Sequence, residues 1–109
     1  MSRAFLIVID SVGIGGAPDA GDFCCGDVPD QGANTVAHIA ETVGLEVPVM
    51  HGLGLWRSVN LASGVRLPGV EAPVSGAWGA ATETSPGKDT PSGHWELAGL
   101  PLPWEWHYF

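Results

Sequence analysis

The stretch that decides the fold class is AFLIVID, residues Ala4–Asp10, an apolar run that ends in a carboxylate. A run of branched residues without polar alternation is typical of a strand buried on both faces, as in parallel α/β sheets. In such sheets ligands bind beyond the carboxyl ends of the strands, where Asp10 falls. Carboxylate oxygens suit hard cations, so Asp10 is a candidate metal ligand. The alternative is that Asp10 caps the following turn.

A long loop, residues 11–33, follows this predicted strand. Its glycines Gly13, Gly15 and Gly16 would let backbone N–H groups approach a ligand. A dinucleotide-binding turn needs its glycines to lead at once into a helix, and Pro18 with further turn residues intervenes here. We therefore reject a dinucleotide fold and expect a loop that is functional or disordered.

The second informative stretch is GKDTPSGHWE, residues Gly87–Glu96. Pro91 suits the first turn of a helix, which makes Thr90 a natural N-cap with its hydroxyl among unpaired N–H donors. This positive helix end suits a phosphate group, whether bound or covalently carried. The alternative is that Thr90 only caps the helix. A Walker-type phosphate loop is excluded because Asp89 separates Lys88 from Thr90.

Capping residues, prolines and glycines place the remaining elements. The elements expected are a helix from a cap at Asn34 or Thr35 to Gly44, a short helix over 48–53, a strand over 77–83 and a helix from Pro91 to Ala98. Residues 60–76 are turn-rich and predict no element. The strand over 77–83 would lead directly into the Gly87–Glu96 stretch.

The charge balance limits the partners of this chain. Its net charge is −8, from 12 acidic and 4 basic residues among 109. This charge argues against nucleic acid and anionic membranes, although metal ions can still recruit phosphate to an acidic protein. No signal-peptide pattern or membrane-spanning stretch is present. The adjacent Cys24 and Cys25 suit reduced thiols better than a disulfide, so we expect a cytoplasmic protein.

Three motifs together resemble the phosphopentomutases, which belong to the alkaline phosphatase superfamily. They are DSVGIGGAPDA (10–20), NTVAHIAE (34–41) and GKDTPSGHWE (87–96). The resemblance implies an α/β fold, the amino-terminal portion of a mainly parallel, alkaline-phosphatase-like sheet with flanking helices and without the cap domain. Residues 1–99 would be the amino-terminal part of the metal-binding core, and residues 100–109 the start of the connection to the missing cap. Ser92 stands where the family has threonine.

The resemblance also implies roles for single residues. Thr90 matches the threonine that carries the phosphate and contacts metal, and Asp10 matches a ligand of one of two metal ions, usually Mn²⁺ with Mg²⁺ as the alternative. The reaction implied interconverts ribose or deoxyribose 1-phosphate and 5-phosphate. It passes through a phosphothreonine and a bisphosphate intermediate, with a sugar bisphosphate as activator. We add Lys88 as a candidate for binding the transferred phosphate.

Family members are several times longer than 109 residues. The resemblance therefore implies an amino-terminal fragment that is inactive alone, because the remaining metal ligands would lie in the missing carboxyl-terminal part. One alternative is a non-catalytic fragment that is poorly folded alone or stable only against a complementary chain. An oligomer or the missing carboxyl-terminal part would be its protein partner. The other is a different phosphatase or mutase of the superfamily, such as a cofactor-independent phosphoglycerate mutase. The expected small-molecule partner is a pentose phosphate.

Overall fold

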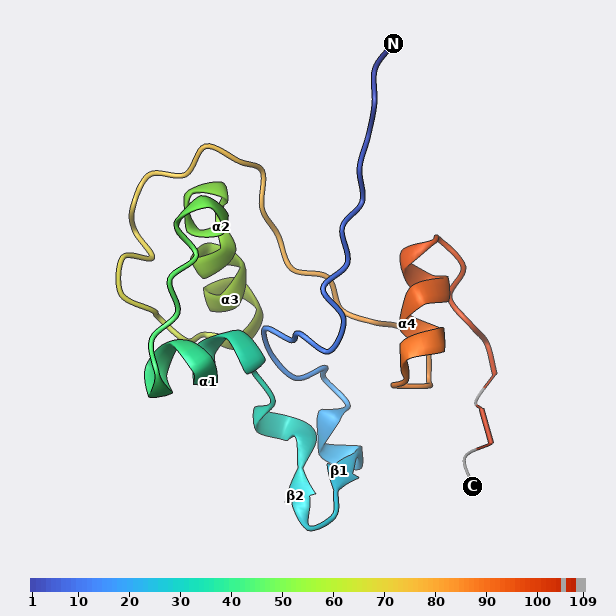
Figure 1. Ribbon diagram of the computed structural model, residues 1–109. Helices are drawn as coiled ribbons and strands as arrows, with labels where there is room; N and C mark the ends of the chain where they lie inside the picture. The colour runs from blue at the N-terminus through green and yellow to red at the C-terminus, as the bar shows by residue number, and fades with distance from the viewer. Residues whose placement is uncertain (105, 108–109) are drawn as a thin grey trace.

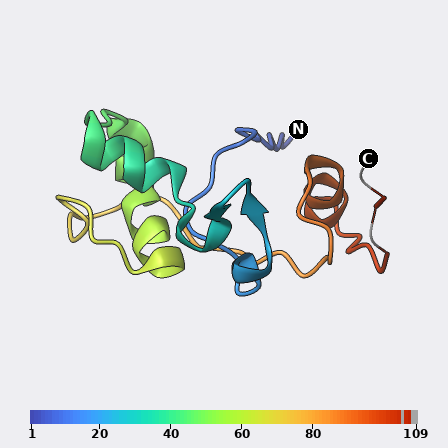
Figure 2. The same cartoon turned by 90° about the horizontal axis from the view of Figure 1, so that it is seen from below.

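The structure, a computed structural model, describes residues 1–104, 106 and 107. It is an α/β chain with four helices and one small sheet in this described part. The helices are α1 (Thr35–Thr42), α2 (Pro48–Leu53), α3 (Leu55–Ser63) and α4 (Thr90–Leu97); the strands are β1 (Cys24–Cys25) and β2 (Val28–Pro29); 3₁₀ turns span Ala20–Asp22 and Asp30–Gly32. The molecule is flat, 45 × 44 × 19 Å, with α1–α3 on one side, α4 on the other and the hairpin between them (Figures 1 and 2).

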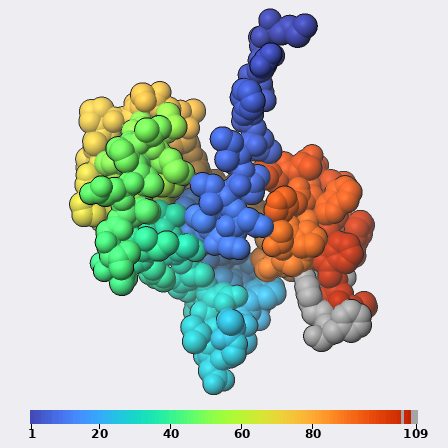
Figure 3. Space-filling model, viewed as in Figure 1, coloured from blue at the N-terminus to red at the C-terminus, as the bar shows by residue number. Residues whose placement is uncertain are grey.

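The sheet corrects the prediction of a mainly parallel one. β1 and β2 pair antiparallel, with Cys24 opposite Pro29 and Cys25 opposite Val28. Residues 4–9 form no strand and extend away from the body (Figure 3), and Phe5 is 83% exposed. Residues 77–83 also lie outside any strand. Both strand predictions are wrong for this structure, because a strand requires backbone hydrogen bonds from a neighbour, and neither segment has one in the described part of the chain.

The predicted helices are present as α1, α2 and α4. The Asn34 side chain accepts a hydrogen bond of 2.9 Å from the Ala37 N–H and so caps α1. Pro48 is the first residue of α2, as expected. Gly54, at φ 117°, then separates α2 from α3, and a Cβ there would lie 2.6 Å from the Trp78 side chain. Only glycine fits this left-handed, crowded position.

The apolar core lies between α1, α3 and the loop that follows α3. Its buried side chains are Val36, Ala37, Trp56, Val59, Leu67 and Val70. The helix α4 lies outside this core and is held instead by polar contacts around two buried serines, Ser85 and Ser92. None of the helices described is long and apolar enough to cross a membrane.

Replacing Trp56 with alanine is expected to lower the free energy of unfolding by about 3–5 kcal/mol, because a large buried side chain leaves a cavity. Trp56 is 6% exposed, and its ring stacks on His51 with centroids 5.2 Å apart. Urea denaturation measures the change. Trp95→Ala is the matched control, since Trp95 is 52% exposed and should change the free energy by only about 0.5 kcal/mol. Equal losses in both variants would contradict this location of the core.

Candidate functional site

Thr90 is the first residue of α4, and the residue that caps this helix is Asp89. The Asp89 carboxylate accepts hydrogen bonds of 2.9 Å from both the N–H and the hydroxyl of Ser92. The prediction of Thr90 as the N-cap is therefore wrong. The signal that was missed is the rank of the capping residues, because aspartate is the stronger cap and sits one position earlier.

Because Asp89 caps α4, the Thr90 hydroxyl does not serve as the cap of this helix. Thr90 is exposed at the positive end of α4, and no hydrogen bond to its hydroxyl is found among the described residues. The alternative interpretation, that Thr90 is present only as a cap, does not hold. An exposed hydroxyl at a helix N-terminus is well placed to bind or carry a phosphate group.

The turn before Thr90 packs tightly against the first turn of α4. A Cβ at Gly87 would lie 2.7 Å from the Ser92 Oγ and 2.8 Å from an oxygen of Asp89. A side chain at residue 87 would therefore displace the Ser92 hydroxyl or the Asp89 carboxylate, which hydrogen-bond to each other. The buried Ser92 hydroxyl also accepts a hydrogen bond of 3.0 Å from the Trp106 indole N–H. These contacts fix the start of α4.

Glu96, in the last turn of α4, binds residues 84 and 85, which lead into the turn before Thr90. One of its oxygens accepts hydrogen bonds from the Thr84 N–H (2.8 Å) and hydroxyl (3.2 Å). The other accepts from the Ser85 N–H (2.8 Å) and hydroxyl (2.5 Å). These bonds, foremost that of the Ser85 hydroxyl and then that of the Thr84 N–H, lower the pKa of Glu96 from 4.5 to about 2.

Acid should remove this contribution of Glu96 to stability. A carboxyl whose pKa falls on folding stabilises the protein above its ordinary pKa, and the contribution is lost as the pH falls from 4.5 to about 2. The measurement is the difference in the free energy of unfolding between the wild-type chain and Glu96→Gln, by urea denaturation at each pH. The difference should narrow over this window. A difference that stays constant over this window would refute the assignment.

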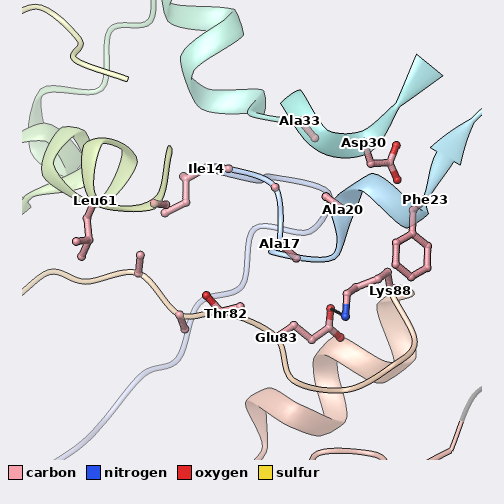
Figure 4. Close-up of a pocket in the computed structure, with 15 residues that line it drawn as sticks. Ile14, Ala17, Ala20, Phe23, Asp30, Ala33, Leu61, Thr82, Glu83 and Lys88 are labelled. Atoms are coloured by element: carbon pink, nitrogen blue, oxygen red, sulfur yellow. Dashed lines mark ion pairs between the residues drawn. The ribbon is translucent and has the colours of Figure 1, made fainter. Parts of the chain in front are cut away.

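Lys88 joins the loop of the first motif to the turn before Thr90. Its ammonium donates a hydrogen bond of 2.7 Å to the Ser85 carbonyl and lies 3.1 Å from Asp19. It also lies 4.0 Å from Glu83 (Figure 4). Burial raises the pKa of Glu83, and the positive charge of Lys88 opposes this effect. The Lys88 side chain is only 18% exposed. Its charge is thus compensated within the protein, and the sequence alone had indicated neither partner.

Lys88 and Glu83 border a cavity of about 600 Å³ between these two loops (Figure 4). Gly15 and Gly16 also line the cavity, and a Cβ on Gly16 would lie 3.1 Å from the Gln31 carbonyl oxygen. These glycines therefore serve close backbone packing. Neither Asp10 nor Thr90 is among the residues that line the cavity.

Asp10 lies in an exposed turn at the end of the extended amino-terminal segment. Its carboxylate accepts a hydrogen bond of 3.2 Å from the Ser11 N–H, and Ser11 has a left-handed φ of 60°. The turn contact predicted as the alternative is therefore present. Among the described residues no hydrogen bond or ion pair joins Asp10 to Thr90, and no three side chains of His, Cys, Asp or Glu form a group that could hold a metal ion.

The chain is similar in sequence to proteins named Phosphopentomutase. The chain is 50% identical over 125 residues to the protein named Phosphopentomutase of Sinorhizobium medicae (strain WSM419), and 46% identical over 124 residues to that of Methylobacterium sp. (strain 4-46). A third protein of this name, from Rhizobium meliloti (strain 1021), is 50% identical over 125 residues. Each match covers 100% of this chain and 29% of the relative, so the chain spans under a third of their length. No protein-family model matches the chain.

Proposed function

We propose that this chain, which is similar over its whole length to part of proteins named phosphopentomutase, supplies the phosphate-carrying residue of such an enzyme. The observation that carries the proposal is the position of Thr90 at the start of α4, where Asp89 takes over the capping and leaves the hydroxyl exposed. Similarity along the entire chain, at 46–50% identity, supports the same enzyme.

In the proposed reaction, phosphorylated Thr90 transfers its phosphoryl group to a pentose phosphate. The bond from phosphorus to the threonine oxygen breaks, and a bond to the free sugar hydroxyl forms, which gives a bisphosphate. The bisphosphate turns and returns its other phosphoryl group to Thr90. Ribose or deoxyribose 1-phosphate and 5-phosphate are interconverted, with a sugar bisphosphate as activator. The positive end of α4 stabilises the oxygens of the transferred group.

We further propose that Asp10 and Thr90 hold a metal ion, Mn²⁺ or Mg²⁺. Their donor atoms, a carboxylate and a hydroxyl oxygen, are of the hard type that these ions prefer. When bound, the metal makes the threonine oxygen a better nucleophile and leaving group. Two donors are too few for a metal site, and the described residues contain no group of three His, Cys, Asp or Glu side chains that could hold a metal ion. The proposal therefore takes the remaining ligands from outside this segment.

The finer features of the fold and location belong to the same proposal. Residues 4–9 would form a strand of a mainly parallel, alkaline-phosphatase-like sheet once strands from outside this segment pair with them; the exposure of Phe5 and Ile7, 83% each, supports this. Lys88 would bind the substrate phosphate while it keeps its ion pair with Asp19. We propose that the enzyme acts in the cytoplasm, in line with the free thiols of Cys24 and Cys25.

The test is a hybrid enzyme, in which residues 1–109 replace the aligned segment of the Sinorhizobium medicae relative. The assay follows the conversion of ribose 1-phosphate to ribose 5-phosphate with Mn²⁺ and a sugar bisphosphate. We expect turnover at a rate close to that of the unmodified relative, and none from the 109-residue chain alone. A folded hybrid that is inactive on pentose phosphates, or active on phosphoglycerate instead, would contradict the proposal.

A further inference from the structure

The position of Glu96 in α4 needs an explanation beyond the stability of the helix. The residue lies in the last turn, where the helix dipole disfavours a negative charge. Its carboxylate nevertheless receives four hydrogen bonds, all of them from Thr84 and Ser85. Glu41 occupies the corresponding next-to-last position of α1, and no hydrogen bond to its carboxylate is found in the described part of the chain. The contacts of Glu96 are therefore a specific arrangement.

These contacts hold the segment from residue 84 to residue 89 against α4. Residues 84 and 85 are attached to the end of the helix by Glu96, and Asp89 is attached to its start through Ser92. Ser85 makes two further contacts. Its carbonyl oxygen accepts a hydrogen bond from the Lys88 ammonium, and its hydroxyl accepts a hydrogen bond of 3.0 Å from the Leu102 N–H. Ser85 is 1% exposed. The turn that ends at Thr90 is thus tied to α4 on both sides.

We infer that Glu96 is a positioning residue for Thr90: by fastening residues 84 and 85 to the far end of α4, it fixes the turn that presents the Thr90 hydroxyl. This inference rests on the proposed phosphoryl transfer by Thr90. Glu96 need not touch the substrate. Its effect is on the orientation of the nucleophile, where a displacement of about 1 Å can cost about 100-fold in rate.

The test compares Glu96→Gln with Glu41→Gln in the hybrid enzyme. Glutamine keeps the size of the side chain, but its NH₂ must face one of the two backbone N–H groups that the carboxylate binds. We expect Glu96→Gln to lower kcat by about 10- to 100-fold with KM changed by less than about threefold, because orientation matters chiefly in the transition state. Glu41→Gln should leave both constants unchanged.

A milder variant covers the case in which Glu96→Gln does not fold. Thr84→Val removes only the longest of the four hydrogen bonds, at 3.2 Å, and keeps the side-chain shape. It should lower kcat less, again without raising KM. An unchanged kcat in Glu96→Gln, or in Thr84→Val where Glu96→Gln does not fold, would overturn the inference while the hybrid stays active and dependent on Thr90. A rise in KM alone would overturn it too. An inactive wild-type hybrid, or activity that survives Thr90→Ala, would overturn the proposed function itself.

Discussion

Thr90→Ala in the hybrid enzyme is expected to lower kcat by at least about 10³-fold, because it removes the oxygen that carries the phosphoryl group. The structure indicates that this substitution removes the hydroxyl without disturbing the fold. Thr90 is exposed, and the cap of α4 is the Asp89 carboxylate, so the helix should remain intact. The assay is steady-state turnover of ribose 1-phosphate.

Thr90→Ser is the matched variant, since it keeps a hydroxyl at the same position. It should retain measurable turnover, whereas the alanine variant should not. Circular dichroism of both variants checks that α4 is preserved. An alanine variant within about tenfold of wild type would show that another group carries the phosphate, and the assignment of Thr90 would fail.

Asp10→Asn is expected to weaken Mn²⁺ binding and to lower kcat/KM by about 100-fold at limiting metal. Asparagine keeps an acceptor for the Ser11 N–H, which the Asp10 carboxylate binds at 3.2 Å, but it loses the charge that a cation requires. The turn should therefore survive while the metal ligand is lost. Titration of activity against Mn²⁺ measures the effect, and high Mn²⁺ should restore part of the rate.

Asp27→Asn is the control for Asp10, because Asp27 is an exposed aspartate in the turn between β1 and β2. It should leave the Mn²⁺ titration unchanged. If Asp10→Asn also leaves it unchanged, Asp10 serves the turn alone, and the alternative interpretation of this residue is correct.

The helices were predictable because their signals are local. Asn34, Pro48 and the glycines at 44 and 99 mark helix ends, and each has the expected role or a left-handed φ in the structure. The helix α3 was missed, although the spacing of Trp56 and Val59, both buried, indicates a helical face. The hairpin was missed too; Gly26, at φ 62°, is the turn residue that could have shown it.

The strands were not predictable in the same way. The apolar run of residues 4–9 reports a preference for burial, and it carries no information on whether a neighbouring strand is available. Strand pairing depends on residues that lie far apart in the sequence. The run has no partner strand among the described residues, and the Ile7 side chain is 83% exposed. The same reason hid the ion pair of Lys88 with Asp19, whose partners lie far apart in the sequence.

The site of the covalent phosphate decides whether Thr90 is the residue that carries it. The hybrid enzyme would be incubated with Mn²⁺ and a sugar bisphosphate, digested, and its peptides sequenced by tandem mass spectrometry. We expect phosphate on Thr90 in the peptide that contains residues 87–96, and we expect its loss when ribose 5-phosphate is added as acceptor. Phosphate on Ser92 or Thr84 instead, or a protein that turns over without any covalent phosphate, would contradict it.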